Sequence, residues 1–136
     1  MTGKIVYTYV VADLLHMGHI NYLENAKNLA GVDGKLIVGV LTDEAVMEKK
    51  PKPILSFSER FSLIKSLKCV DCVVTQNTYS PLENVKTINP DILIESDSHS
   101  EMPAKLYMES LGKKVIIFPY YPEQSSTKIK ESIKSE

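Results

Sequence analysis

Strand-like and helix-like segments alternate along the whole 136-residue chain. The strand-like runs are rich in β-branched residues and apolar on both faces, which is typical of parallel strands covered by helices on each side. These runs are KIVYTYVV from residue 4, KLIVGVLT from residue 35, VDCVVTQ from residue 70, DILIES from residue 91 and KVIIFP from residue 114. The alternation predicts one α/β domain over residues 1–136, with a doubly wound, five-stranded parallel sheet flanked by helices.

Amphipathic, helix-like segments connect these runs. They cover residues 18–30, residues 56–68, a short stretch near 80–88, a stretch near 102–111, and a last segment from about residue 126. Ligands of doubly wound sheets bind beyond the carboxyl ends of the strands. The loops that follow the strands are therefore where functional residues are expected.

The stretch ADLLHMGHINYL, residues 12–23, lies just beyond the first expected strand. Gly18 allows the backbone to turn tightly and to approach a ligand. The helix that begins near His19 directs its free N–H groups and its positive dipole end toward the ligand space. His16 and His19 can donate further hydrogen bonds to phosphoryl oxygens. Because the chain has no P-loop signature, we expect this turn to hold phosphate.

Two other interpretations of this turn remain open. His16 and His19 are three residues apart and suit a shared zinc ion, which would need a third ligand such as His99 from another loop. Alternatively, the two histidines only cap the helix. Asp13 also has two interpretations: it belongs to the ligand site, or it is a turn cap that holds the histidine loop.

The composition excludes several classes of protein. A formal net charge of −1 at pH 7 argues against a broad nucleic-acid-binding surface. No apolar run is long enough to span a bilayer and no signal peptide precedes the first strand-like run, so we expect a cytoplasmic protein without membrane insertion. Cys69 and Cys72 form a single C-x-x-C pair, which cannot complete a four-cysteine zinc site. We interpret the pair as small core-like residues, with a redox role as the alternative.

Arginine is nearly absent from the chain. Arg60 is the only one, and lysine supplies the other 15 of the 16 basic residues. The planar guanidinium suits bidentate recognition of phosphate or carboxylate, which a lysine does not reproduce. Arg60 is therefore a candidate ligand-binding residue.

Several ordered motifs carry a resemblance to a known family. ADLLHMGHINYLENAK resembles the HxGH signature of the nucleotidyltransferase superfamily and, more closely, that of the cytidylyltransferases, whose usual form is GTFDLLHxGHxxxLxxAK. LTDEAV resembles the family's loop after the second strand, and SFSERFSLIKSLKCVD resembles its RxxxIxxLxxVD segment. SSTKIK, residues 125–130, resembles ISTTxIK at the start of the last helix. The resemblance covers nearly the whole chain.

The resemblance implies a reaction and roles for the charged residues. In that family a small phosphorylated substrate attacks the α-phosphorus of a nucleoside triphosphate, and pyrophosphate leaves. His16 and His19 would stabilise the charge that develops on the phosphates, and Arg60 would grip phosphate. Lys49 would reach the α-phosphate or the incoming substrate, with Lys50 and Lys52 as the alternatives.

The resemblance also implies a nucleotide-binding set and two partners. The residues of this set are Val10, Val11, Ala12, Asp13, Gly18, Asp97, Tyr120, Ser125, Ser126 and Thr127. Among them, Ser126 and Thr127 would hold the β- and γ-phosphates, or would only cap the last helix. We expect Mg²⁺ to accompany the triphosphate. A homodimer is expected because the segment of residues 60–71 often lies near a subunit contact in that family.

Departures from the family pattern bear on the substrate. The usual GTFD is VVAD here, the GDD-like turn is ESDSHS, and Tyr120 stands where an arginine is common. The ADLxHxGH form and this tyrosine resemble the cytidylyltransferase domains of phosphonate pathways more than the glycerol-phosphate enzymes. We therefore expect CTP-dependent transfer of CMP to a small phosphorylated or phosphonate acceptor. The alternatives are an adenylyltransferase similar to FAD synthetase and a nucleotide-binding module without catalysis.

Overall fold

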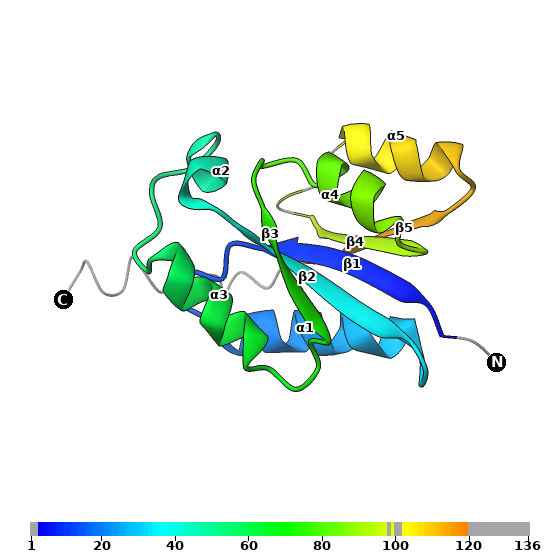
Figure 1. Ribbon diagram of the computed structural model, residues 1–136, viewed down its shortest axis with the longest axis horizontal. Coiled ribbons are helices and arrows are strands. Elements are labelled where there is room, and N and C mark those ends of the chain that lie inside the picture. The colour runs from blue at the N-terminus through cyan, green and yellow to red at the C-terminus, as the bar shows by residue number, and fades with distance from the viewer. Residues whose placement is uncertain (1–2, 98, 100–101, 120–136) are drawn as a thin grey trace.

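The computed structural model describes residues 3–97, 99 and 102–119, and it contains a five-stranded, all-parallel sheet (Figure 1). The strand order is β3-β2-β1-β4-β5. The strands are β1 (Ile5–Val10), β2 (Lys35–Leu41), β3 (Cys72–Gln76), β4 (Ile92–Ser96) and β5 (Lys114–Phe118). This architecture confirms the predicted doubly wound, Rossmann-like α/β fold.

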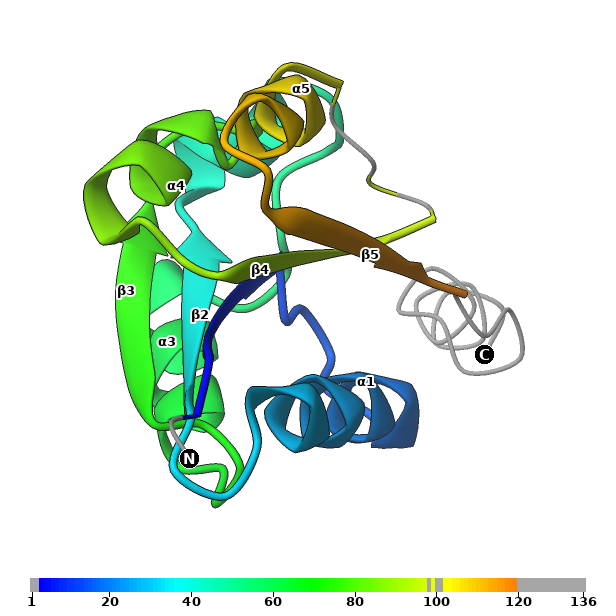
Figure 2. The same cartoon turned by 90° about the vertical axis from the view of Figure 1, so that its right-hand side faces the viewer.

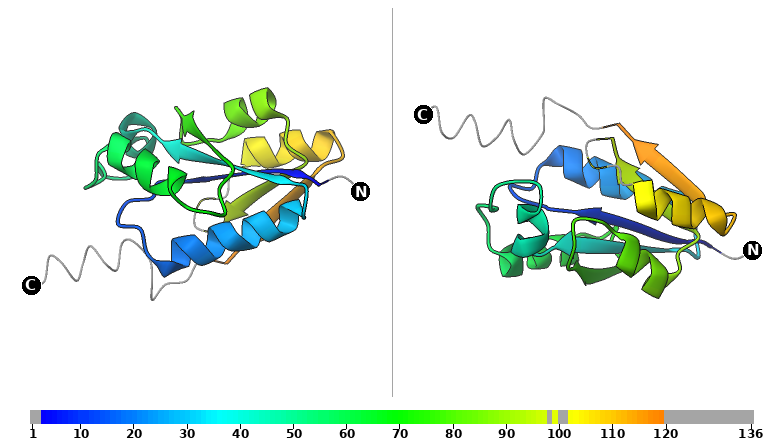
Figure 3. Two further views of the ribbon diagram at one scale, coloured as in Figure 1. Left: turned by 60° about the horizontal axis from the view of Figure 1, so that its bottom comes forward. Right: turned by 90° about the horizontal axis from the view of Figure 1, so that it is seen from above.

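Helices cover both faces of the sheet (Figures 2 and 3). The helices are α1 (Met17–Ala30), α2 (Asp43–Met47), α3 (Phe57–Lys65), α4 (Leu82–Ile88) and α5 (Met102–Ser110). α1 and α3 pack on one face, where Leu23 and Ile64 join the apolar core. α2, α4 and α5 pack on the other face, around Leu93 and Met108.

Two expected elements need comment. The LTDEAV stretch, which resembles the family's loop after the second strand, contains the short helix α2, which was not predicted. Thr42 caps this helix by accepting a hydrogen bond from the Ala45 N–H at 3.1 Å, and two acidic residues lie in its first turn. Both features stabilise a helix start. The last helix, expected from about residue 126, lies outside the described residues.

The switch in strand order lies between β1 and β4. β1 pairs with β2 at six residues but with β4 at only two, Val6 and Tyr7. Beyond this point a side chain bridges the two strands, because the Thr8 hydroxyl donates to the carbonyl of Ile94 at 2.9 Å. Ligands of doubly wound sheets bind at such a switch point, on the carboxyl side of the strands. The histidine loop follows β1 directly on that side.

A buried polar network fixes the middle of the sheet. The Tyr7 hydroxyl donates to Gln76 Oε1 at 2.5 Å and accepts from Asn84 Nδ2 at 3.0 Å. A Cβ atom at Gly39 would lie 1.9 Å from this hydroxyl. Gly39 in β2 therefore leaves the space that the Tyr7 ring fills.

No helix in the described part of the chain is long and apolar enough to cross a membrane.

Candidate functional site

The histidine loop runs from the end of β1 into α1, and His16 is the N-cap residue of that helix. His16 Nδ1 accepts a hydrogen bond from the Gly18 N–H at 3.0 Å, and His19 Nδ1 accepts one from the His16 N–H at 3.2 Å. The two ring centroids lie 4.2 Å apart. Because each Nδ1 accepts from a backbone N–H, each neutral ring carries its proton on Nε2. The capping role that the sequence left open is real, and it leaves the Nε2–H of His16 as a donor.

The surroundings keep these rings uncharged at neutral pH. Burial, together with a smaller effect of the neighbouring His16, lowers the pKa of His19 to about 4, although Asp13 acts in the opposite direction. Burial also lowers the pKa of His16. His16 Nε2 is buried and has no hydrogen-bond partner among the described residues. A buried donor without a partner is rare in folded proteins. At a helix N-terminus it suits a ligand oxygen.

Asp13 fastens the histidine loop to the segment before α3. This residue is almost fully buried. Its two carboxylate oxygens accept from the N–H groups of Ile54 and Leu55, each at 2.9 Å. The sequence left two interpretations of Asp13 open. In the structure Asp13 holds the histidine loop, as one of them predicts. Its role toward a nucleotide stays a prediction.

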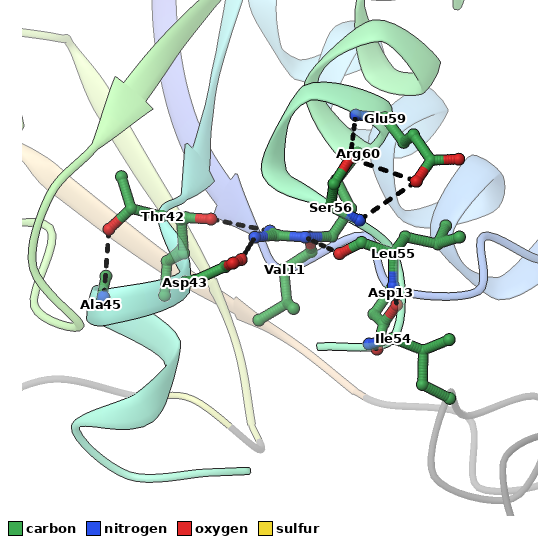
Figure 4. A network of polar contacts seen from close by, with 11 residues as sticks. Val11, Asp13, Thr42, Asp43, Ala45, Ile54, Leu55, Ser56, Glu59 and Arg60 are labelled. Carbon is green, nitrogen blue, oxygen red and sulfur yellow. Dashed lines mark hydrogen bonds and ion pairs between the residues drawn. The ribbon is translucent and has the colours of Figure 1, made fainter. Parts of the chain in front are cut away.

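Arg60 lies inside the protein, at the N-terminal end of α3 (Figure 4). Its side chain has no exposed surface. It donates to the carbonyls of Val11, Leu41 and Leu55 and forms an ion pair with Asp43 at 2.7 Å. The structure therefore surrounds the only arginine with protein acceptors. Its expected grip on phosphate stays a prediction.

The lysine-containing loop follows α2, beyond the carboxyl end of β2. Lys49, Lys50 and Lys52 are all exposed. Lys50 lies close enough to His99 to lower the pKa of that histidine. Exposed ammonium groups on this side of the sheet suit contact with a phosphorylated ligand, and the choice among the three lysines stays a prediction.

His99 belongs to an aromatic cluster beyond β4. Its Nε2 lies 2.9 Å from the carbonyl of Tyr79, its ring stacks on the Tyr79 ring at 3.7 Å, and Tyr9 packs edge-on at 4.7 Å. Burial lowers the pKa of His99 to about 4. Within the described residues, no three His, Cys, Asp or Glu side chains gather in a group that could hold a metal ion. A zinc ion shared by His16, His19 and His99 therefore finds no support there.

The remaining predicted site residues divide into three groups. Val10, Ala12 and Gly18 are buried: Val10 ends β1, Ala12 lies in the loop after it, and Gly18 lies in the first turn of α1. Asp97 is exposed after β4, and its N–H donates to the carbonyl of Phe118 at 3.0 Å. Tyr120, Ser125, Ser126 and Thr127 lie outside the described residues.

The two cysteines are unbonded, with Cys69 half-buried and Cys72 exposed at the amino end of β3, away from the site edge.

Sequence reasoning missed one buried carboxylate at this edge. Glu95 is fully buried near the carboxyl end of β4, and its Oε2 accepts a hydrogen bond from the Tyr9 hydroxyl. The signal was present, because a glutamate interrupts the otherwise apolar DILIES run. Buried carboxylates require polar partners, and here a tyrosine of the neighbouring strand β1 supplies one.

Comparisons with known proteins match most of this chain. A model of the family described as cytidylyltransferase-like matches residues 8–132. The bifunctional protein HldE of Citrifermentans bemidjiense is 32% identical over 136 residues, which is 97% of this chain and 27% of that protein. HldE of Helicobacter hepaticus is 36% identical over 135 residues, with 96% and 27% covered. The chain thus spans about a quarter of the length of the curated relatives it matches.

A solved structure is also similar. It is a lipopolysaccharide core biosynthesis protein from Thermoplasma volcanium, with a TM-score of 0.72 and 29% identity. The superposition covers 88% of this chain and 98% of that one. A protein of unknown function from Archaeoglobus fulgidus shares the fold at a TM-score of 0.64 and 20% identity, covering 85% of this chain and 96% of its own.

Proposed function

The chain belongs to the cytidylyltransferase-like family of nucleotidyltransferases, and we propose that it transfers a cytidylyl group from CTP to a small acceptor with a phosphate or phosphonate group. The observation that carries this proposal is the buried His16 Nε2, which has no partner among the described residues. It lies beside His19, at the N-terminus of α1, beyond the switch point of the sheet. Such a site offers neutral donors to a phosphoryl group.

The reaction follows from the donors that the site provides. An acceptor oxygen attacks the α-phosphorus of the triphosphate, a new P–O bond forms, and the bond to the departing pyrophosphate breaks. Negative charge spreads over the phosphoryl oxygens during this step. His16 and His19 donate hydrogen bonds from Nε2 to those oxygens. Neither imidazole has to gain or lose a proton in the step. Fixed donors of this kind are worth about 10²–10³ in rate each.

Mg²⁺ is proposed as the companion of the triphosphate. Mg²⁺ is usually held by substrate phosphates with one or two protein carboxylates, and it keeps several waters. The described residues form no dedicated metal-binding group, which suits a metal bound mainly through the nucleotide. The metal would supply charge neutralisation on the pyrophosphate. Lys49, and Ser126 and Thr127 of the last motif, are the proposed further phosphate contacts.

The acceptor class has support from two directions. The motif details resemble phosphonate-pathway enzymes, whereas the similar structure from Thermoplasma volcanium is named for lipopolysaccharide core biosynthesis. Lipopolysaccharide core is built from sugars, and nucleotide-activated sugars arise from sugar phosphates. Both acceptors present a phosphoryl oxygen as the nucleophile. We propose that the acceptor attacks through such an oxygen, whether it belongs to a phosphate or to a phosphonate. We also propose that the enzyme is a homodimer in the cytoplasm.

Pyrophosphate release tests the proposal. The protein is incubated with Mg²⁺, CTP and one acceptor at a time: glycerol 3-phosphate, phosphocholine, phosphoethanolamine, 2-aminoethylphosphonate, phosphonopyruvate or a sugar phosphate. We expect release with CTP and one of these acceptors. Parallel reactions contain ATP, and release with ATP alone would replace the cytidylyl assignment by an adenylyl one. Binding of CTP in calorimetry without release from any acceptor would favour a nucleotide-binding module instead.

A further inference from the structure

The histidine loop contains two residues in an unfavourable backbone conformation. Ala12 has φ of 63° and Leu14 has φ of 57°. Residues other than glycine pay about 1–2 kcal/mol each in this left-handed region. Such conformations persist only where the surrounding structure holds them, and they concentrate at functional sites. Both residues lie within four positions of His16, so whatever holds them also places the imidazoles.

Asp13 holds this loop from between the two residues. Its carboxylate accepts from the backbone of Ile54 and Leu55. Leu55 is held in turn, because its carbonyl accepts from Arg60 Nε at 3.2 Å. The loop is thus fastened to a segment that Arg60 fixes.

Arg60 also holds the start of the loop. One terminal nitrogen donates to the carbonyl of Val11 at 2.8 Å and to that of Leu41 at 2.7 Å, and the other donates to Asp43 at 2.7 Å. The hydrogen bonds therefore close a ring that runs from Val11 through Asp13 and Leu55 to Arg60 and back to Val11 (Figure 4). We call this set of contacts the arginine clamp.

We propose that Arg60 is a positioning residue, which acts on the reaction by clamping the loop of residues 11–16 and so placing His16 and His19, and not by contact with phosphate. All but one of its N–H groups are already bonded to protein acceptors. Asp43 balances its charge. The inference rests on the proposed function of the two histidines, and it assigns Arg60 a different role from the one that the family resemblance implies.

Arg60→Lys is the test variant. The lysine ammonium keeps the charge. It lacks the planar fork of the guanidinium, so it cannot donate to three carbonyls and a carboxylate at once. If the clamp positions the histidines, kcat falls by about 10²-fold, the loss expected from displacing a catalytic group by about 1 Å. KM for the nucleotide stays unchanged, because no phosphate contact is lost.

Imidazole ¹⁵N spectra provide a readout that needs no turnover. In the wild type, Nδ1 of His16 and Nδ1 of His19 each accept a backbone hydrogen bond, which gives the Nε2–H tautomer. We expect Arg60→Lys to change these signals. Asp13→Asn, on the other side of the clamp, should change the same signals if Arg60→Lys fails to fold. Met108→Ala is the matched control. Met108 is fully buried in α5 and packs on the other face of the sheet. This variant should therefore lose stability, while kcat, KM and both imidazole signals stay as in the wild type.

Two results would overturn the inference. A higher KM for CTP in Arg60→Lys, with unchanged imidazole signals, would place Arg60 on the phosphate. Unchanged signals and unchanged kcat in both clamp variants would leave the clamp without any influence on the histidines. A wild type that releases no pyrophosphate would refute the proposed function instead, and the spectra would still decide whether the clamp orients the rings.

Discussion

Acidification should remove a defined amount of stability through His19. The side chain is only 9% exposed, and burial lowers its pKa from 6.5 to about 4. Between these two values the unfolded chain binds a proton at this residue and the folded protein does not. Stability therefore rises with pH across this window and is lost as the pH falls through it. A tenfold change in proton affinity is worth about 1.4 kcal/mol, so the full loss is about 3 kcal/mol.

Urea unfolding of the wild type and of His19→Asn at pH 7 and pH 4.5 measures this loss. The Asn side-chain oxygen can take the place of Nδ1 and accept from the His16 N–H, but it does not titrate. At pH 4.5 the wild type should have lost about 2–3 kcal/mol more than His19→Asn, relative to pH 7. His99, whose pKa is also lowered to about 4, remains in both proteins and cancels.

Equal losses in the two proteins would refute the reasoning. They would mean that His19 takes up its proton in the folded state at an ordinary pKa, with the Nδ1 hydrogen bond broken. The donors of the site would then be imidazolium groups at mildly acidic pH, and the assignment of neutral Nε2–H donors would be wrong.

Three further predictions follow from the described contacts. His16→Ala should lower kcat by about 10²–10³-fold and should cost about 1 kcal/mol in urea unfolding, because it also removes the cap hydrogen bond to the Gly18 N–H; a wild-type rate would remove His16 from the site. Turnover should stay level between pH 8 and pH 6, because the pKa values of both imidazoles are lowered, and an inflection near 6.5 in the kcat profile would contradict this. Gly39→Ala should cost about 1–3 kcal/mol in urea unfolding, because its Cβ would lie 1.9 Å from the Tyr7 hydroxyl. Adding Tyr7→Phe should recover part of that loss, and no recovery would place the strain elsewhere.

The fold was readable from the sequence because its signals are local. Five apolar runs without polar alternation predict buried parallel strands, and each observed strand lies within its predicted run. α2 was missed because five residues carry too little periodicity for a helix to be recognised. The start signals were nevertheless present, since Thr42 precedes Asp43 and Glu44.

The site was readable only in part, for a related reason. His16, Gly18 and His19 are close in sequence, so their placement at a helix N-terminus follows from the local pattern. The partners of Arg60 include three backbone carbonyls, and a carbonyl leaves no signature in the sequence. Only the folded chain brings the ends of β1 and β2 and the start of α3 to one guanidinium. The rarity of arginine marked the residue correctly as special, but rarity does not distinguish a ligand contact from an internal clamp.

The distribution of charge in this site separates two tasks. In the proposed site the histidines are neutral at pH 7, because their pKa values are lowered, and Asp43 balances the charge of Arg60. Donors that are held in place by the fold lose little to solvent reorganisation, which suits stabilisation of a transition state. The exposed lysines of the loop after α2 carry formal charges that solvent and salt screen. Such charges suit attraction and initial binding of an anionic substrate. In this arrangement the clamp belongs with the first task, because rigid neutral donors are effective only where the loop that carries them cannot move.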